Sequence, residues 1–114
     1  LFHKIEEIDY EIDYMSVPNS SSFDTQLKDS ISRAHAKSIG VDEIKLIPST
    51  SNGFTDSRFT RANGTITYGF SGAHPDDDPG LANVHGTDES IGISSLVSGT
   101  KTMLALAYDL CNSE

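Results

Sequence analysis

Residues 53–59 combine glycine, hydroxyl, carboxylate and guanidinium groups within one short stretch, Gly53-Phe54-Thr55-Asp56-Ser57-Arg58-Phe59. The guanidinium of Arg58 has the geometry to bind a substrate carboxylate through two parallel hydrogen bonds. Asp56 is placed to orient Arg58 or the neighbouring backbone. A capped turn fits the same residues, with Thr55 or Asp56 capping a short helix and Arg58 in a surface ion pair. Spacing alone leaves both interpretations open.

A second segment of interest surrounds His85, in the sequence Val84-His85-Gly86-Thr87-Asp88-Glu89. Neutral imidazole is a common zinc ligand, and a carboxylate four residues later, Glu89, can support such a ligand or cap a following helix. A solvated loop histidine is the alternative. His74 and Asp76 also have a spacing that suits a cation, but the run of aspartates at 76–78 is more typical of a solvated acidic loop, and the calcium-loop spacing is absent.

Composition narrows the classes of partner. The 114 residues include 17 Asp+Glu and 8 Lys+Arg, for a net charge of −9. This charge repels phosphate backbones and anionic lipid, so we expect neither nucleic acid nor membrane as a partner. The single cysteine excludes a disulfide framework or a multi-cysteine zinc site within one chain. No apolar run approaches the roughly 20 residues of a membrane span and no secretion signal opens the chain, so a cytoplasmic protein is expected.

Hydrophobic periodicity predicts the elements that would position these groups. Residues 8–14 alternate apolar and acidic side chains, as in a half-buried strand, and short strands are expected at 43–48 and 65–70. Helical spacing predicts one helix from about residue 23 to Gly40, with a cap at Ser21 or Ser22. It predicts a second helix at the end of the chain, with Ser94 as a plausible cap. One face of this helix holds Ile93, Leu96, Val97, Thr100, Leu104, Ala107 and Cys111. The expected fold class is α/β, two main helices packed on a small sheet of about three strands.

The remaining segments are predicted to be irregular. Residues 49–64 are small and polar, which indicates loops or a short helix. Residues 71–92 lack periodicity and concentrate Gly, Pro, Asp and His, so we expect a long surface loop, a kind of segment that often carries function. Gly99, inside the second helix, indicates a close packing contact.

Taken together, these motifs resemble the C-terminal part of metallopeptidase family 20. The resemblance rests on residues 53–59, on Thr67-Tyr68-Gly69-Phe70, and on His85-Gly86-Thr87-Asp88-Glu89 ahead of a final amphipathic helix, in that order. The family contains zinc hydrolases such as aminoacylase, acetylornithine deacetylase, succinyl-diaminopimelate desuccinylase and bacterial glutamate carboxypeptidase. The match spans nearly the whole chain but only the last quarter to third of a typical member. With a first residue of Leu1 rather than Met, it predicts that this chain is a piece of a longer protein.

The resemblance implies a division of the chain. Residues 1–15 would be the last strand of the family's lid or dimerisation domain, and residues 16–22 the hinge connector. Residues 23–114 would form the C-terminal part of the zinc-peptidase catalytic domain. A homodimer is implied for the parent enzyme.

The resemblance also implies site roles. His85 would be a metal ligand, holding one of two zinc ions, and Glu89 would support it. Gly53, Thr55 and Arg58 would line the substrate pocket.

Asp56 would organise that pocket. In the complete enzyme the two zinc ions would activate a shared water for attack on the amide bond of peptides or N-acyl amino acids. The remaining ligands and the glutamate base lie upstream in the family, so this chain contributes no catalytic residue and is expected to be inactive and metal-free by itself. Asp88 replaces the family's usual asparagine and the 71–81 loop is longer, which leaves substrate choice open.

A different class of function also fits the sequence. A small acidic α/β module without catalysis would pair the edge of the 8–14 strand with another copy or another chain. Strand-swapped self-association is the expected behaviour of that module.

Overall fold

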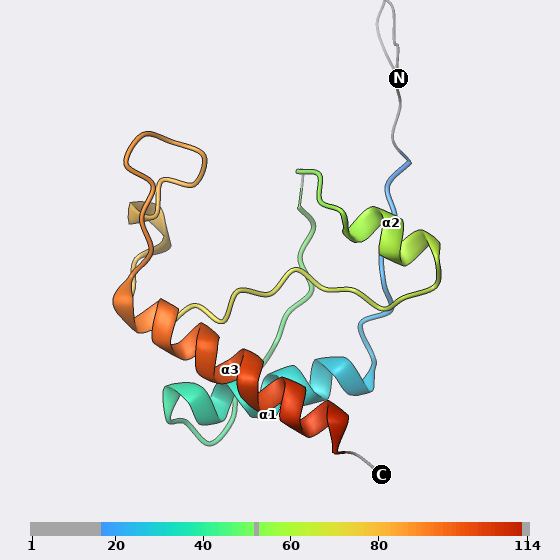
Figure 1. The fold of residues 1–114 in the computed structure, drawn as a ribbon, viewed down its shortest axis with the longest axis horizontal. Coiled ribbons are helices and arrows are strands. Elements are labelled where there is room, and N and C mark those ends of the chain that lie inside the picture. The colour runs from blue at the N-terminus through green and yellow to red at the C-terminus, as the bar shows by residue number, and fades with distance from the viewer. Residues whose placement is uncertain (1–16, 52, 113–114) are drawn as a thin grey trace, which may run out of the picture.

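The computed structural model describes residues 17–51 and 53–112, and within these ranges the chain is helical (Figure 1). Its elements are α1 (Gln26–Ile39), α2 (Ser57–Ala62), the short 3-10 helix η1 (Pro79–Leu81) and α3 (Ile93–Cys111). No strand forms within the described residues, so the predicted α/β fold with a three-stranded sheet is wrong for this part of the chain. The strand predicted at 8–14 lies outside the described residues.

The segments 43–48 and 65–70 were predicted to be strands, but each is a single extended segment. Their backbone groups form hydrogen bonds with side chains of other residues. The Ile44 carbonyl accepts a hydrogen bond from Ser32 Oγ at 3.0 Å, and the Thr67 N–H donates to Ser21 Oγ at 2.9 Å. The Thr67 carbonyl accepts from the Arg61 guanidinium at 2.9 and 3.1 Å. Strand propensity measures how well a residue fits between neighbouring strands, so without a neighbour these β-forming residues remain single extended segments.

Local signals set the ends of α1 as expected. Thr25 Oγ1 accepts from the Lys28 N–H at 3.2 Å, which satisfies one of the free donors of the first turn. Gly40 ends the helix with φ of 76°, a left-handed conformation that glycine adopts without steric cost. The predicted start was a few residues early: Thr25 caps the helix, and the Ser21 hydroxyl accepts a hydrogen bond from the Thr67 N–H instead.

Helix α3 packs across α1 through a face of small polar residues, and this differs from the prediction. Ser95, Ser98 and Thr102 are the buried residues of α3. The residues predicted to form its buried apolar face are exposed, with Ile93 at 80% and Leu104 at 72%. Gly99 makes the close contact that the sequence indicated: a Cβ built on it would lie 2.9 Å from the Ser71 carbonyl oxygen.

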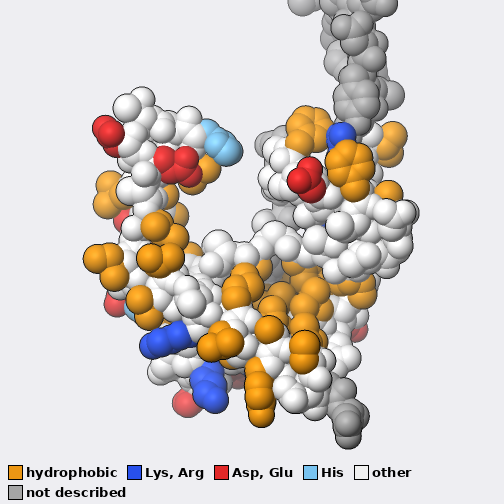
Figure 2. All heavy atoms as spheres, viewed as in Figure 1, with side chains coloured by type: hydrophobic (Ala, Val, Ile, Leu, Met, Phe, Trp, Pro, Cys, Tyr) orange, Lys and Arg blue, Asp and Glu red, His pale blue; other side chains and the backbone are white. Residues whose placement is uncertain are grey.

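The molecule is open. Its radius of gyration is 18.3 Å, against about 13 Å for a compact chain of this length. The buried hydrophobic residues among those described are Ile31, Ala34 and Ala36, all on α1. Figure 2 shows hydrophobic side chains spread over the side of the molecule where α3 lies. No described helix is both long and apolar enough to cross a bilayer.

Two projections rise from the α1–α3 base, with an open gap between them (Figure 2). One contains residues 53–64 with α2. The other, called the arm below, consists of residues 72–92, with η1 near its middle. The long surface loop predicted for 71–92 therefore forms, and the short helix that was one of the options for residues 49–64 is α2.

Candidate functional site

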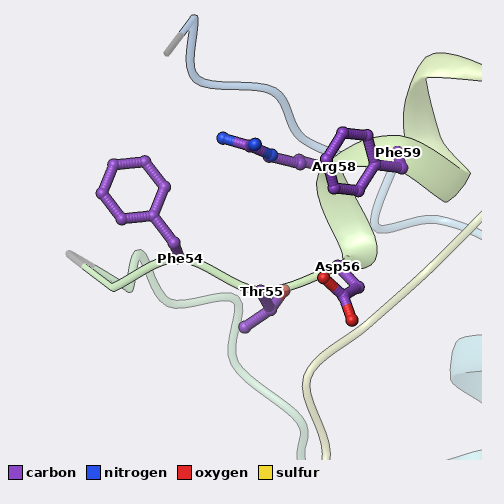
Figure 3. A pocket seen from close by; sticks show the side chains of 5 residues that line it. All are labelled: Phe54, Thr55, Asp56, Arg58 and Phe59. Carbon is purple, nitrogen blue, oxygen red and sulfur yellow. The ribbon is translucent and has the colours of Figure 1, made fainter. Parts of the chain in front are cut away.

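The Arg58 segment forms a shallow hollow of about 390 Å³ that is open to solvent. Figure 3 shows its lining, which comes from one continuous stretch at the start of α2 and consists of Phe54, Thr55, Asp56, Arg58 and Phe59. The candidate residues Thr55, Asp56 and Arg58 therefore do lie together. Gly53 precedes the hollow, with its N–H bound to Ser51 Oγ at 3.2 Å.

Aromatic rings hold the Arg58 guanidinium. Its Cζ lies 4.5 Å from the centroid of the Phe59 ring and 5.9 Å from that of Phe54. A planar guanidinium stacks on aromatic faces while its N–H groups remain directed outward along the edge. Asn19 Nδ2 also donates to the Arg58 carbonyl oxygen at 2.9 Å, which ties the start of α2 to the segment before α1. These contacts place the Arg58 guanidinium beside the two rings that line the hollow.

Thr55 and Asp56 act mainly on the backbone of the α2 entry. Thr55 Oγ1 accepts from the Ser57 N–H at 3.3 Å, and the Asp56 carbonyl accepts from the Phe59 N–H at 2.9 Å. Asp56 occupies the N-cap position, but its side chain makes no capping hydrogen bond. In Figure 3 the Asp56 carboxylate and the Arg58 guanidinium point in different directions. The capped-turn interpretation thus describes Thr55 better than Asp56.

His85 lies at the tip of a closed loop within the arm. The loop closes where the Ser90 N–H donates to the Ala82 carbonyl at 3.0 Å and Ser90 Oγ donates to the Leu81 carbonyl at 3.2 Å. Across its middle, Asn83 Nδ2 donates to the Thr87 carbonyl at 2.6 Å. This closure holds the tip in one conformation although the loop has no regular structure.

The backbone of this tip is unusual. Asn83, His85 and Asp88 all have positive φ, at 47°, 63° and 59°. Left-handed conformations cost energy for residues with a Cβ and gather at functional sites. The His85 N–H donates to Glu89 Oε2 at 3.3 Å, so Glu89 contacts the backbone of His85. The His85 side chain is exposed to solvent, as a residue that meets a ligand from outside would be.

The structure does not bring the two candidate groups into one pocket. The hollow beside Arg58 is lined by residues 54–59 alone, and His85 is on the arm, across from α2. Within residues 17–51 and 53–112 there is no group of three His, Cys, Asp or Glu side chains placed to hold a metal ion. A zinc site usually needs three or four protein donors, and the described residues do not bring that many together.

Sequence reasoning missed the role of Asp77. This residue, which belongs to an apparently solvated acidic run, accepts from the Ser95 N–H through Oδ2 at 2.6 Å. The hydroxyl and the N–H of Ser95 lower the pKa of the Asp77 carboxyl, because both interactions favour the charged form. Asp77 therefore supplies the side-chain cap that Gly92, the N-cap residue of α3, cannot supply.

Comparisons with known proteins add no relative: no protein-family model, curated protein or solved structure matches this chain.

Proposed function

We propose that this chain is the C-terminal part of the catalytic domain of a zinc-dependent amidohydrolase of metallopeptidase family 20. The parent enzyme would cleave the amide bond of peptides or N-acyl amino acids. In this proposal the chain contributes one zinc ligand, His85, and one substrate-binding group, Arg58. The division into residues 1–15, 16–22 and 23–114 belongs to the same proposal.

The main observation that supports the proposal is the position and exposure of the His85 side chain. The imidazole is exposed at the tip of a closed loop, on a backbone held in a left-handed conformation and bound by Glu89. The positive φ itself follows from the closed turn, since histidine adopts this conformation more readily than most residues, so the exposure of the side chain is the feature that supports a role in binding. An exposed imidazole on a closed loop is accessible to a metal whose other ligands would come from elsewhere.

The exposed hydrophobic residues support the proposal that this chain is part of a larger protein. The large hydrophobic residues of α3 are mostly exposed, and residues 43–48 and 65–70 are extended without a neighbouring strand among the described residues. A helix that is apolar on most sides is normally buried within a larger core.

Arg58 accounts for the proposed substrate class. A guanidinium between two aromatic rings is a binding group for a carboxylate, and peptides and N-acyl amino acids both carry a free carboxylate beside the scissile amide. When bound, zinc would lower the pKa of a coordinated water and so generate the nucleophile. The residues of this chain would orient the substrate and hold one metal ligand in place.

The test measures zinc in the longest product of the reading frame that contains this chain. We expect stoichiometric zinc and hydrolysis of N-acyl amino acids, with both lost in His85→Ala. His74→Ala is the matched control, because His74 is a second histidine of the arm and its backbone N–H bond to Ser95 Oγ does not need the ring. Zinc content that is unchanged in His85→Ala would overturn the assignment of this ligand.

A non-catalytic interaction module remains the second candidate function. The exposed apolar side of α3, with Leu104 at 72% and Tyr108 at 73% exposure, favours it. Self-association of the 114-residue chain, including pairing through residues 8–14, is its expected behaviour. Sedimentation at increasing concentration tests it: a monomer at all concentrations would argue against this module.

A further inference from the structure

A line of polar contacts, rather than apolar packing, fastens the arm to the helices. Ser98 Oγ donates to the Gly72 carbonyl at 2.6 Å, and the His74 N–H donates to Ser95 Oγ at 2.9 Å. On the same face of α3, Thr102 Oγ1 lies 3.1 Å from Nδ1 of His35 in α1. We call this set the polar seam: His35, Ser95, Ser98 and Thr102 with the backbone of residues 72–74.

The hydrogen bonds of Thr102 indicate which nitrogen of His35 faces it as a donor. The single hydroxyl hydrogen of Thr102 is donated to the Ser98 carbonyl, 2.7 Å away, so Thr102 acts as an acceptor toward His35. Nδ1 of His35 therefore carries a hydrogen.

The surroundings of His35 are ill suited to a positive charge. The residue is 8% exposed, and the Phe70 ring packs edge-on against it with the centroids 5.2 Å apart. Burial lowers the pKa of the His35 imidazole; the Ala73 carbonyl partly opposes this effect, and the charge of His74 adds to it. His74 is thus the titratable group that acts on His35 from the arm. The groups that face it from α3 and from residues 70–73, namely Thr102, Phe70 and the Ala73 carbonyl, are neutral.

We propose that His35 is a pH-dependent latch, which holds the base of the arm against α3 when its imidazole is neutral and loosens it when the imidazole is protonated. The physical reason is that a cation is costly in this buried contact between α1, α3 and residue 73, whereas the freed arm lets water reach the ring. The polar seam holds the arm by a few hydrogen bonds. A small change in free energy at His35 therefore shifts the equilibrium between the attached and the detached arm. The inference does not depend on zinc or on hydrolysis.

The experiment follows amide hydrogen exchange of the 114-residue chain at about pH 5 and about pH 7.5, which bracket the usual histidine pKa. Rates are divided by the intrinsic rate at each pH. We expect protection of the His74 and Ser95 amides to fall about tenfold or more at the lower pH. The Asn63 and Gly64 amides, at the end of α2, serve as an internal reference and should not change. Equal protection of His74 and Ser95 at both pH values would overturn the proposal.

Four variants test the role of His35. His35→Asn keeps an N–H donor near the Nδ1 position but does not titrate, so protection should be equal at both pH values; a loss at pH 5 as large as in the natural chain would overturn the proposal. His74→Asn should still lose protection at pH 5. If protection in this variant is equal at both pH values, the pH effect comes from His74 instead. Thr102→Val removes the acceptor and should lower protection at both pH values, while Thr102→Ser should behave as the natural chain does. Unchanged protection in Thr102→Val would contradict the seam. Circular dichroism verifies the helices of each variant.

Discussion

The Asp77 carboxylate and the Ser95 backbone N–H form a 2.6 Å hydrogen bond that joins the arm to the first turn of α3. Gly92 leaves room for this contact: a Cβ built on it would overlap the Asp77 carboxylate. A negative charge at the N-terminus of a helix interacts favourably with its free N–H groups. The acidic loop and the helix therefore stabilise one another.

Asp77→Asn should weaken this junction, because it removes the charge while it keeps the shape. The Ser95 amide should exchange faster than in the natural chain, and Asp78→Asn, the matched control, should leave it unchanged because Asp78 caps η1 instead. The lowered pKa of Asp77 gives the pH dependence: the stabilisation is complete above the unfolded value of about 3.9 and is lost as the pH falls through the lower folded value. Thermal unfolding from pH 5 downward should show this slope in the natural chain and a smaller one in Asp77→Asn.

Gly99→Ala should destabilise the fold although alanine favours helices. The helix propensity gain is about 1 kcal/mol. The new Cβ would meet the backbone oxygen of Ser71 at 2.9 Å, and backbone cannot move aside cheaply, so overpacking of about 1–3 kcal/mol is expected to outweigh that gain. Urea unfolding measures the difference. Gly69→Ala is the control, since nothing lies within 4 Å of its Cβ position, and a larger loss there than at Gly99 would contradict the packing argument.

Leu104→Ser and Tyr108→Ser should reduce exposed apolar surface with little change in stability. Both side chains are largely exposed, so the free energy of unfolding should change by less than about 0.5 kcal/mol. Binding of a hydrophobic dye should decrease in the double variant. Ile31→Ala, at a buried position on α1, should instead cost about 2–5 kcal/mol. A comparable cost for the α3 double variant would show that these residues are covered in solution.

Arg58→Lys should impair binding of substrates that carry a free carboxylate. A lysine keeps the charge but loses the planar two-pronged contact and the stacking on Phe54 and Phe59. In the parent enzyme we expect KM to rise about tenfold with little change in kcat, the pattern of lost ground-state binding. A substrate with a carboxamide in place of the carboxylate should show no such difference. An equal effect on both substrates would mean that Arg58 supports the fold only.

Local sequence signals determined the helices and the turns and loops between them. The extent of α3, the stop of α1 at Gly40, the close contact at Gly99 and the irregular 71–92 loop depend on side-chain spacing and backbone freedom, both of which are properties of a short stretch of chain. The grouping of Thr55, Asp56 and Arg58 was also predictable, because all three lie within one turn.

Tertiary structure decided what those elements face. Residues 43–48 and 65–70 have the composition of strands, but a strand exists only when another backbone lies beside it, and none does among the described residues. Helix α3 has an apolar face and a small polar face. The polar face is the buried one: Thr102 contacts His35 of α1, while Ser95 and Ser98 bind the backbone of residues 72–74. Asp77 and His35 gained their partners only when distant segments met. Side-chain spacing identifies residues that are close along the chain. The partners of Asp77 and His35 are distant along the chain and close only in space.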